Sequence, residues 1–284
     1  MKRIIIAILL LAATPAWAQD VPVGPVGLCR FDPATLTFAG TPAEQAECLM
    51  QKVARGGAIA PRPLPVTFKA LLAKGRAPTP EQSKAALAAF PEPYRGFATL
   101  YADWPPSRTS GGMPLAYFVI HDTSMPFLGN DPFPRDPDRD LRVNDLWVYA
   151  TDEPVAHIFL NRAGTIWPGH ELVEGWRATK LESWVVGPAA RGRFFHVETV
   201  QPRRYAPGST SLGDTLAPVP GFSTAQYRML AALYVYASAR AGAWLIPAQH
   251  ATMDAGLPDG HDDPQNFEVE KFAAEVERIL DVKQ

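Results

Sequence analysis

The spacing of hydrophobic positions predicts several strands in the middle of the chain. The near-continuous apolar run AYFVI at 116–120 is typical of a strand buried on both faces. The Asn-Arg-Ala-Gly turn at 161–164 predicts a hairpin. In the stretch FFHVETV, one alternating set holds His196 and Glu198 among apolar residues, so a histidine and a carboxylate share one face. The stretch FFHVETV is the strand predicted at 194–200, and the other predicted strands are 146–150, 155–160 and 165–167.

Helical spacing, with start and stop signals, predicts helices on both sides of this region. The clearest begins at Ser223, which forms a capping box with Gln226, and it ends at Gly242. A Thr-Pro start followed by an acid or an amide predicts two earlier helices, from Thr41 to about Arg55 and from Thr79 to about Phe90.

The C-terminal end is also predicted to be helical, with Asn266 as its cap. The apolar stripe of this last helix is Phe272, Val276, Ile279 and Leu280.

Residues 125–142 (MPFLGNDPFPRDPDRDLR) form a long predicted loop, and such loops in compact domains are often functional.

The N-terminal residues predict an exported protein. Residues 1–19 have a basic start, an apolar run and the small-x-small site Ala16-Trp17-Ala18, as a signal peptide does. The apolar run is too short for a stable membrane span, and no cysteine at the cleavage point offers a lipid anchor. Residues 20–112 show little chemistry. They are expected to form a partly helical N-terminal extension that wraps or precedes the main domain, or that binds a partner.

Composition predicts a disulfide and argues against two classes of partner. Cys29 and Cys48 follow the signal, and in an oxidising compartment they are expected to pair and to contribute about 3 kcal/mol, the alternative being two free thiols. The net charge of −2 is spread along the chain without a basic block. Nucleic acid and anionic membrane surfaces are therefore not expected as main partners.

The stretch Gln249–Phe267 is the candidate for a metal site. It contains His250, His261 and the adjacent aspartates Asp262 and Asp263. Zinc takes neutral imidazole and carboxylate ligands, and a catalytic zinc has three protein ligands and an open position. His250 and one aspartate would supply two ligands, and His121, at the end of the strand predicted at 116–120, is the best candidate for the third. A polar surface loop is the alternative.

Five stretches in this order resemble the type 2 N-acetylmuramoyl-L-alanine amidases, a family that includes phage amidase lysozymes and peptidoglycan-recognition proteins. They lie within 115–271 and read FVIHDTS, AHIFLNRAGTIW, FFHVETV, FSTAQYRMLAALYVYA and QH…DDPQNF. The resemblance implies an α/β fold with a mixed central β-sheet flanked by helices. It also implies a zinc site at one end of the sheet and a zinc amidase domain at 113–284.

Carried over by position, the family's zinc ligands fall on His121, His250 and Asp263. Its catalytic acid falls on Glu198, which is expected to act as general base and then general acid. His261 stands where many members have a lysine, and it is expected to stabilise the tetrahedral oxyanion or to shuttle the proton.

Each assignment has a competing interpretation. Asp262 is the alternative third ligand, Glu198 is alternatively paired with an arginine such as Arg203, and His261 is alternatively a solvated loop residue. His157 is expected to pack under the site. No role is expected for the two remaining histidines of the mature chain, His170 and His196.

Two departures from the family pattern bear on the substrate. The segment WRATKLES at 176–183 lacks a histidine that many members have there, and Lys180 is the candidate for part of its role. Ala156 stands where some branches have an aromatic residue before His157.

The resemblance predicts hydrolysis of the amide bond between N-acetylmuramic acid and L-alanine in peptidoglycan, in the periplasm or outside the cell. Zinc would polarise the carbonyl and activate water. One alternative is a non-catalytic module that binds peptidoglycan or muropeptide. The other is a zinc amidase that acts on another acylated substrate.

Overall fold

The computed structural model describes residues 28–89 and 105–281. The predicted signal peptide at 1–19 therefore lies outside the described residues, as does the last residue of the helix predicted to end at Phe90. Within the described part, no helix is both long enough and apolar enough to cross a membrane.

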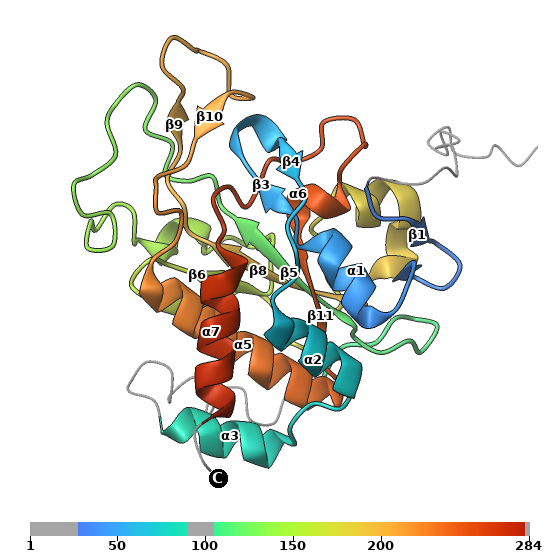
Figure 1. The fold of residues 1–284 in the computed structure, drawn as a ribbon. Helices are drawn as coiled ribbons and strands as arrows, with labels where there is room; N and C mark the ends of the chain where they lie inside the picture. Colours follow the sequence, from blue (N-terminus) through green and yellow to red (C-terminus); the bar gives the residue numbers. More distant parts are fainter. Residues whose placement is uncertain (1–27, 90–104, 282–284) are drawn as a thin grey trace, which may run out of the picture.

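A five-stranded mixed sheet forms the centre of the fold, in the order β11-β5-β8-β6-β7 (Figure 1). The first four strands in this order run parallel, and β7 pairs antiparallel with β6 through the predicted hairpin. The mixed α/β fold predicted from the sequence is therefore confirmed. The strands are β5 (Tyr117–Asp122), β6 (Ile158–Leu160), β7 (Ile166–Pro168), β8 (Phe194–Thr199) and β11 (Ile246–Gln249).

The register of the two central strands brings chemistry to one end of the sheet. His121 on β5 is paired with Glu198 on β8. Because paired residues of neighbouring strands project to the same face, both side chains point to the same side of the sheet. β11 lies on the other side of β5 and ends at Gln249, directly before His250. Three segments that are remote in sequence therefore meet at the carboxyl ends of parallel strands.

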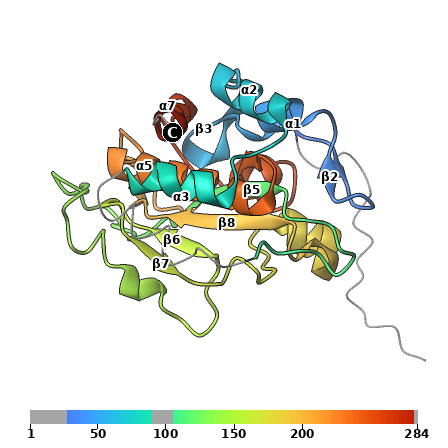
Figure 2. The ribbon, with the colours of Figure 1, turned by 90° about the horizontal axis from the view of Figure 1, so that it is seen from below.

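Helices α5 (Thr224–Ala241) and α7 (Val269–Leu280) cover one face of the sheet (Figure 2). The Phe118 ring packs against Tyr234 of α5 and Phe272 of α7, with ring centroids 5.4 and 6.4 Å apart. The predicted capping box at the start of α5 is present, and Gly242 ends this helix with a left-handed backbone (φ 75°). Glycine adopts this conformation without steric cost, which explains why the helix ends there.

The N-terminal segment packs against the sheet and shares its core. The Tyr117 hydroxyl on β5 donates to Gln45 Oε1 (2.7 Å) and accepts from the backbone N–H of Phe38 (3.0 Å). The predicted disulfide between Cys29 and Cys48 is present and ties the start of this segment to its first helix. The helices are α1 (Pro42–Leu49), α2 (Val66–Lys74) and α3 (Pro80–Ala88).

Short elements complete the described fold. Strand β11 leads directly into the short helix α6 (His250–Met253), and the helical turns η3 (Leu181–Val186) and η4 (Gly187–Ala190) precede β8. The short strands are β1 (Phe31–Asp32), β2 (Thr37–Phe38), β3 (Lys52–Val53), β4 (Ile59–Ala60), β9 (Arg204–Tyr205) and β10 (Thr215–Leu216). The short helices are η1 (Arg55–Gly57), η2 (Leu146–Tyr149), η3 (Leu181–Val186), η4 (Gly187–Ala190) and α6 (His250–Met253).

Two predictions in the N-terminal half were wrong or incomplete. The helix predicted from Thr41 to Arg55 ends at Leu49, because Lys52–Val53 leaves the helix to pair with Ile59–Ala60 as a small hairpin. Helix α2 was not predicted, since it follows a proline-rich stretch and no side chain caps its start.

Two further predictions in the rest of the chain were wrong. The strand predicted at 146–150 is the helical turn η2, which Asp145 caps by accepting from the Trp147 N–H (3.0 Å). Asn266 does not cap the last helix, because its backbone is left-handed (φ 59°), whereas the cap residue Glu268 is extended.

Candidate metal centre

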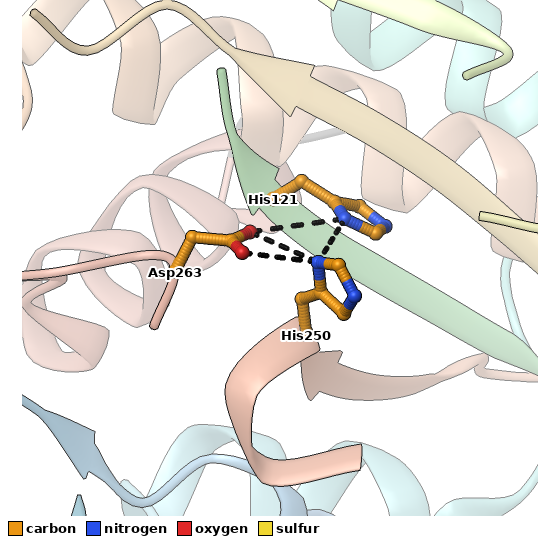
Figure 3. Close-up of side chains that lie close together, drawn as sticks. All are labelled: His121, His250 and Asp263. Carbon is orange, nitrogen blue, oxygen red and sulfur yellow. Dashed lines mark hydrogen bonds and ion pairs between the residues drawn. The ribbon is translucent and has the colours of Figure 1, made fainter. Parts of the chain in front are cut away.

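Three side chains from three separate segments converge at the end of the sheet (Figure 3). The Nδ1 atoms of His121 and His250 lie 2.9 Å apart. The Asp263 carboxylate lies 3.0 Å from His250 Nδ1 and 3.8 Å from His121 Nδ1. His121 ends β5, His250 begins α6, and Asp263 lies in the loop before α7. All three are buried, and the group could hold a metal ion.

The other ring nitrogen of His121 contacts His196, which in turn pairs with the buried Glu182. His121 Nε2 lies 3.0 Å from His196 Nδ1, and His196 Nε2 lies 3.2 Å from the Glu182 carboxylate. A ligating histidine commonly hydrogen-bonds a second group through its free nitrogen, which fixes its tautomer and orientation. His196, for which no role was expected, therefore lies in direct contact with a candidate ligand.

The other ring nitrogen of His250 is held by Asp254. Its Nε2 lies 2.9 Å from Asp254 Oδ2. The Asp254 carboxylate also accepts hydrogen bonds from the backbone N–H groups of Lys180 (3.1 Å) and Leu181 (2.9 Å). Asp254 thus has a fixed position and fixes the ring of His250 in turn.

His261, the predicted second catalytic residue, lies against His250 on the side away from Asp263. Its Nδ1 is 2.6 Å from His250 Nε2 and 3.6 Å from Asp254. Its side chain is 49% exposed. His250, Asp254 and His261 form a second group whose atoms could hold a cation, but this group shares His250 with the first.

The neighbouring aspartates Asp262 and Asp263 have different surroundings. Asp262 accepts from Gln265 Nε2 (2.6 Å) and pairs with Arg203 (3.3 Å). Asp263 faces the histidines and accepts from the backbone N–H of Asp122 (3.1 Å). Of the two candidates for third ligand, the structure brings only Asp263 to the histidines.

Arg203 pairs with aspartates rather than with Glu198. Its guanidinium is buried and lies 2.7 Å from Asp122 and 3.3 Å from Asp262. Asp122 also accepts from the backbone N–H of Gln265 (3.0 Å). This network joins the end of β5 to the loop that carries Asp263, so it supports the site without entering it.

Glu198 faces the same centre from β8. Its Oε1 lies 3.8 Å from His121 Nδ1, and its Oε2 is buried without a hydrogen-bond partner among the described residues. Burial, together with repulsion from the Asp263 carboxylate, raises the pKa of Glu198 well above its ordinary value. A buried carboxyl oxygen without a partner is costly, so this atom is a candidate contact for a ligand of the site.

Burial and neighbouring charges shift the pKa values of the ligand candidates in opposite directions. Burial and repulsion from His250 lower the pKa of His121 well below its ordinary value. Burial opposes the charged form of His250, but the carboxylates of Asp263 and Asp254 outweigh it and raise its pKa to about 10. The pKa of Asp263 is lowered, because the nearby His250 outweighs the effect of burial. The three side chains thus lie in a strongly polar pocket within the protein interior.

A cleft of about 420 Å³ opens beside His250. Glu198 and His261 line it as well. Its walls come from the segment before and within η3, where Trp176, Arg177, Thr179, Lys180 and Trp184 lie. The cleft therefore lies next to the candidate metal centre on the side of His250.

Comparisons of this chain with protein-family models, with curated proteins and with solved structures gave no match. The chemistry of the site is therefore inferred from its own residues.

The donor set fits a metal ion of the borderline class. Two imidazole nitrogens and one carboxylate approach a common point, each imidazole is oriented through its second nitrogen, and a cleft reaches one of the three residues, His250. This matches the ligand count of a catalytic site that keeps a position open for water or substrate.

The supporting residues were harder to find in the sequence than the ligands. Asp254 lies four residues after His250 in the same turn, and this spacing was a usable signal. His196 shares a strand face with Glu198, which was visible in the alternation. Its partner Glu182 gives no sequence signal, since only the folded chain brings η3 beneath β8. His157 is buried as expected, and its Nδ1 accepts from the backbone N–H of His196 (3.0 Å).

Replacing Asp254 with asparagine is expected to lower metal affinity about tenfold to a hundredfold, because the amide no longer holds the His250 ring with a negative charge. Competition with a chelator of known affinity measures this. Asp259→Asn is the matched control, since Asp259 is an exposed residue of the same loop and is expected to leave affinity unchanged. Equal affinities for the two variants would contradict the orienting role of Asp254.

Proposed function

We propose that this protein is a zinc-dependent amidase that hydrolyses the bond between N-acetylmuramic acid and L-alanine in peptidoglycan. The observation that carries the proposal is the convergence of His121, His250 and Asp263, with Glu198 beside them, where His250 and Glu198 also line a cleft. The order of the resembling stretches favours this substrate, and the donor set favours zinc over magnesium or calcium, which prefer oxygen ligands.

When bound, zinc would supply Lewis acidity, polarising the amide carbonyl and activating water for attack. His121, His250 and Asp263 would hold it. Glu198 would take the proton of the attacking water at its carboxylate and deliver it to the leaving nitrogen. Its place on β8, paired with His121 on β5, would keep this carboxyl group at the reacting centre.

His261 is proposed to act from the wall of the cleft. It is half-exposed and lies beside Glu198 and His250 in the same cleft. From there its imidazole would stabilise the developing oxyanion or shuttle the proton.

An exported location is part of the proposal, because peptidoglycan lies outside the cytoplasm. The Cys29–Cys48 disulfide is consistent with an oxidising compartment such as the periplasm or the exterior. The residues of the predicted signal support the same location.

A zinc amidase that acts on another acylated substrate is the second candidate. The WRATKLES segment, which lines the cleft, lacks the histidine that many members of the resembling family have there, and the long loop 125–142 also leaves this substrate class open. A binding-only module is less well supported, since the three ligand positions are all filled.

Mass spectrometry of digested peptidoglycan tests the proposal. Purified protein loaded with zinc is expected to release stem peptides that begin with L-alanine, leaving the glycan strands uncut. Muropeptides that stay intact at high protein concentration would contradict amidase activity. Cleavage of other acylated amides without release of stem peptides would favour the second candidate.

A further inference from the structure

The cleft beside the metal centre contains two cationic side chains without carboxylate partners among the described residues. Arg177 forms no hydrogen bond or ion pair there, and its Nε is buried without a partner. Lys180 Nζ contacts the backbone carbonyl of Asp259, which carries no charge. The carboxylate that lines the cleft is Glu198.

An unpaired guanidinium at this position needs an explanation. Three other buried or half-buried arginines of the described fold have polar partners: Arg162 pairs with Asp138, Arg203 with Asp122, and Arg62 donates to backbone carbonyls. Arg204 also has a buried Nε without a partner, but its guanidinium lies over the Phe133 ring and outside the cleft. The guanidinium has five N–H donors in a fixed plane, and this geometry matches a carboxylate through two parallel hydrogen bonds. Arg177 therefore offers a guanidinium without a partner in the same cleft as Glu198 and His250.

Two tryptophans line this part of the cleft. Trp176 donates from Nε1 to the Val155 carbonyl (3.1 Å) and stacks on His170, with ring centroids 4.1 Å apart. Trp184 is 46% exposed, and Lys180 Nζ lies 4.8 Å from its ring centroid. Aromatic surfaces next to cations without carboxylate partners suit a ligand that has both an apolar or ring surface and a negative charge.

We propose that the cleft selects substrates that carry a carboxylate near the scissile amide, and that Arg177 is the specificity-determining residue that pairs with it. Lys180 adds a second positive charge, which attracts the anion before the bidentate contact forms. This inference rests on the proposed amidase function, because that function defines the substrate. The binding preference itself can be measured without hydrolysis. The chemistry recognised is a carboxylate-bearing acyl amide, such as a muramoyl peptide with free acid groups.

The test compares two ligands that differ only in charge. One is N-acetylmuramoyl-L-alanyl-D-glutamate, and the other is the same compound with both carboxylates converted to amides. Binding is measured by calorimetry in the Glu198→Gln background, and hydrolysis is measured in parallel with the unsubstituted protein. The free acid is expected to bind about tenfold to a hundredfold more tightly than the diamide.

Arg177→Gln is expected to remove most of this preference, and Arg177→Lys to keep part of it, because lysine retains the charge but not the bidentate geometry. Arg191→Gln is the matched control, an exposed arginine outside the cleft that is expected to leave the preference unchanged. A circular dichroism spectrum of each variant checks that the fold is retained.

The outcomes separate this inference from the proposed function. Equal binding of the two ligands, a preference that survives Arg177→Gln, or no binding of either ligand would overturn the inference. Hydrolysis of both ligands with the same kcat/KM would overturn it while leaving the amidase function in place. A strong preference that depends on Arg177 without any hydrolysis would remove the amidase function and keep the carboxylate site.

Discussion

Replacing His121 with alanine is expected to abolish both metal binding and amide hydrolysis. The substitution removes one of the three ligands, and with it the contact that links β5 to His250. Because the remaining two ligands would bind zinc far more weakly, we expect metal content to fall from about one ion per chain to near zero. We expect hydrolysis to fall by at least about a thousandfold, since the Lewis acid is lost.

Metal content measured by elemental analysis and hydrolysis of purified peptidoglycan are the two readouts. Asp263→Asn is expected to behave like His121→Ala, because the amide is a weaker metal ligand than the carboxylate. Asp262→Asn is the matched control, as Asp262 pairs with Arg203 and Gln265 rather than with the histidines. If the His121→Ala protein keeps its metal, or if Asp262→Asn loses it while Asp263→Asn does not, the proposed ligand set is wrong.

Replacing Glu198 with glutamine is expected to separate metal binding from catalysis. Glutamine has nearly the same shape but cannot accept and return a proton, so hydrolysis should fall by about a hundredfold to ten-thousandfold. Metal content should stay at about one ion per chain, because Glu198 is not among the three candidate ligands. Initial rates on a soluble muropeptide, together with metal analysis of the same sample, measure both quantities.

Glu171→Gln is the control for this variant, since Glu171 is exposed and lies outside the cleft. It is expected to keep full activity. A Glu198→Gln protein with unchanged rates would exclude Glu198 as the proton carrier and would direct attention to His261. Loss of metal in the same variant would instead identify Glu198 as a ligand.

The sequence predicted those parts of the fold in which local chemistry and tertiary structure agree. The capping box at Ser223, the hairpin around 161–164 and the buried strand that ends near His121 all have signals within a few residues. At 146–150 the apolar pattern favoured a strand, but Asp145 caps a helical turn there, no strand of the described residues pairs with the segment, and Trp147 is 80% exposed.

The residues of the candidate site were likewise predicted only in part. The resemblance pointed to His121, His250 and Asp263, and the folded chain brings these three together. It did not point to Glu182 or Arg177. Their positions depend on how the segment before β8 packs against β8 and beside α6. The spacing of residues along the sequence does not predict such packing.

The pairing of β5 with β8 has a consequence for how this site can change. Since residues alternate between the faces of a strand, inserting or deleting one residue inside β8 would turn Glu198 away from His121 and bring a neighbour such as Val197 or Thr199 in its place. The long segment 125–142, by contrast, lies outside these paired strands, although Phe127 bridges to Arg203. Redesign of the site must therefore keep the number of residues in β5 and β8 unchanged.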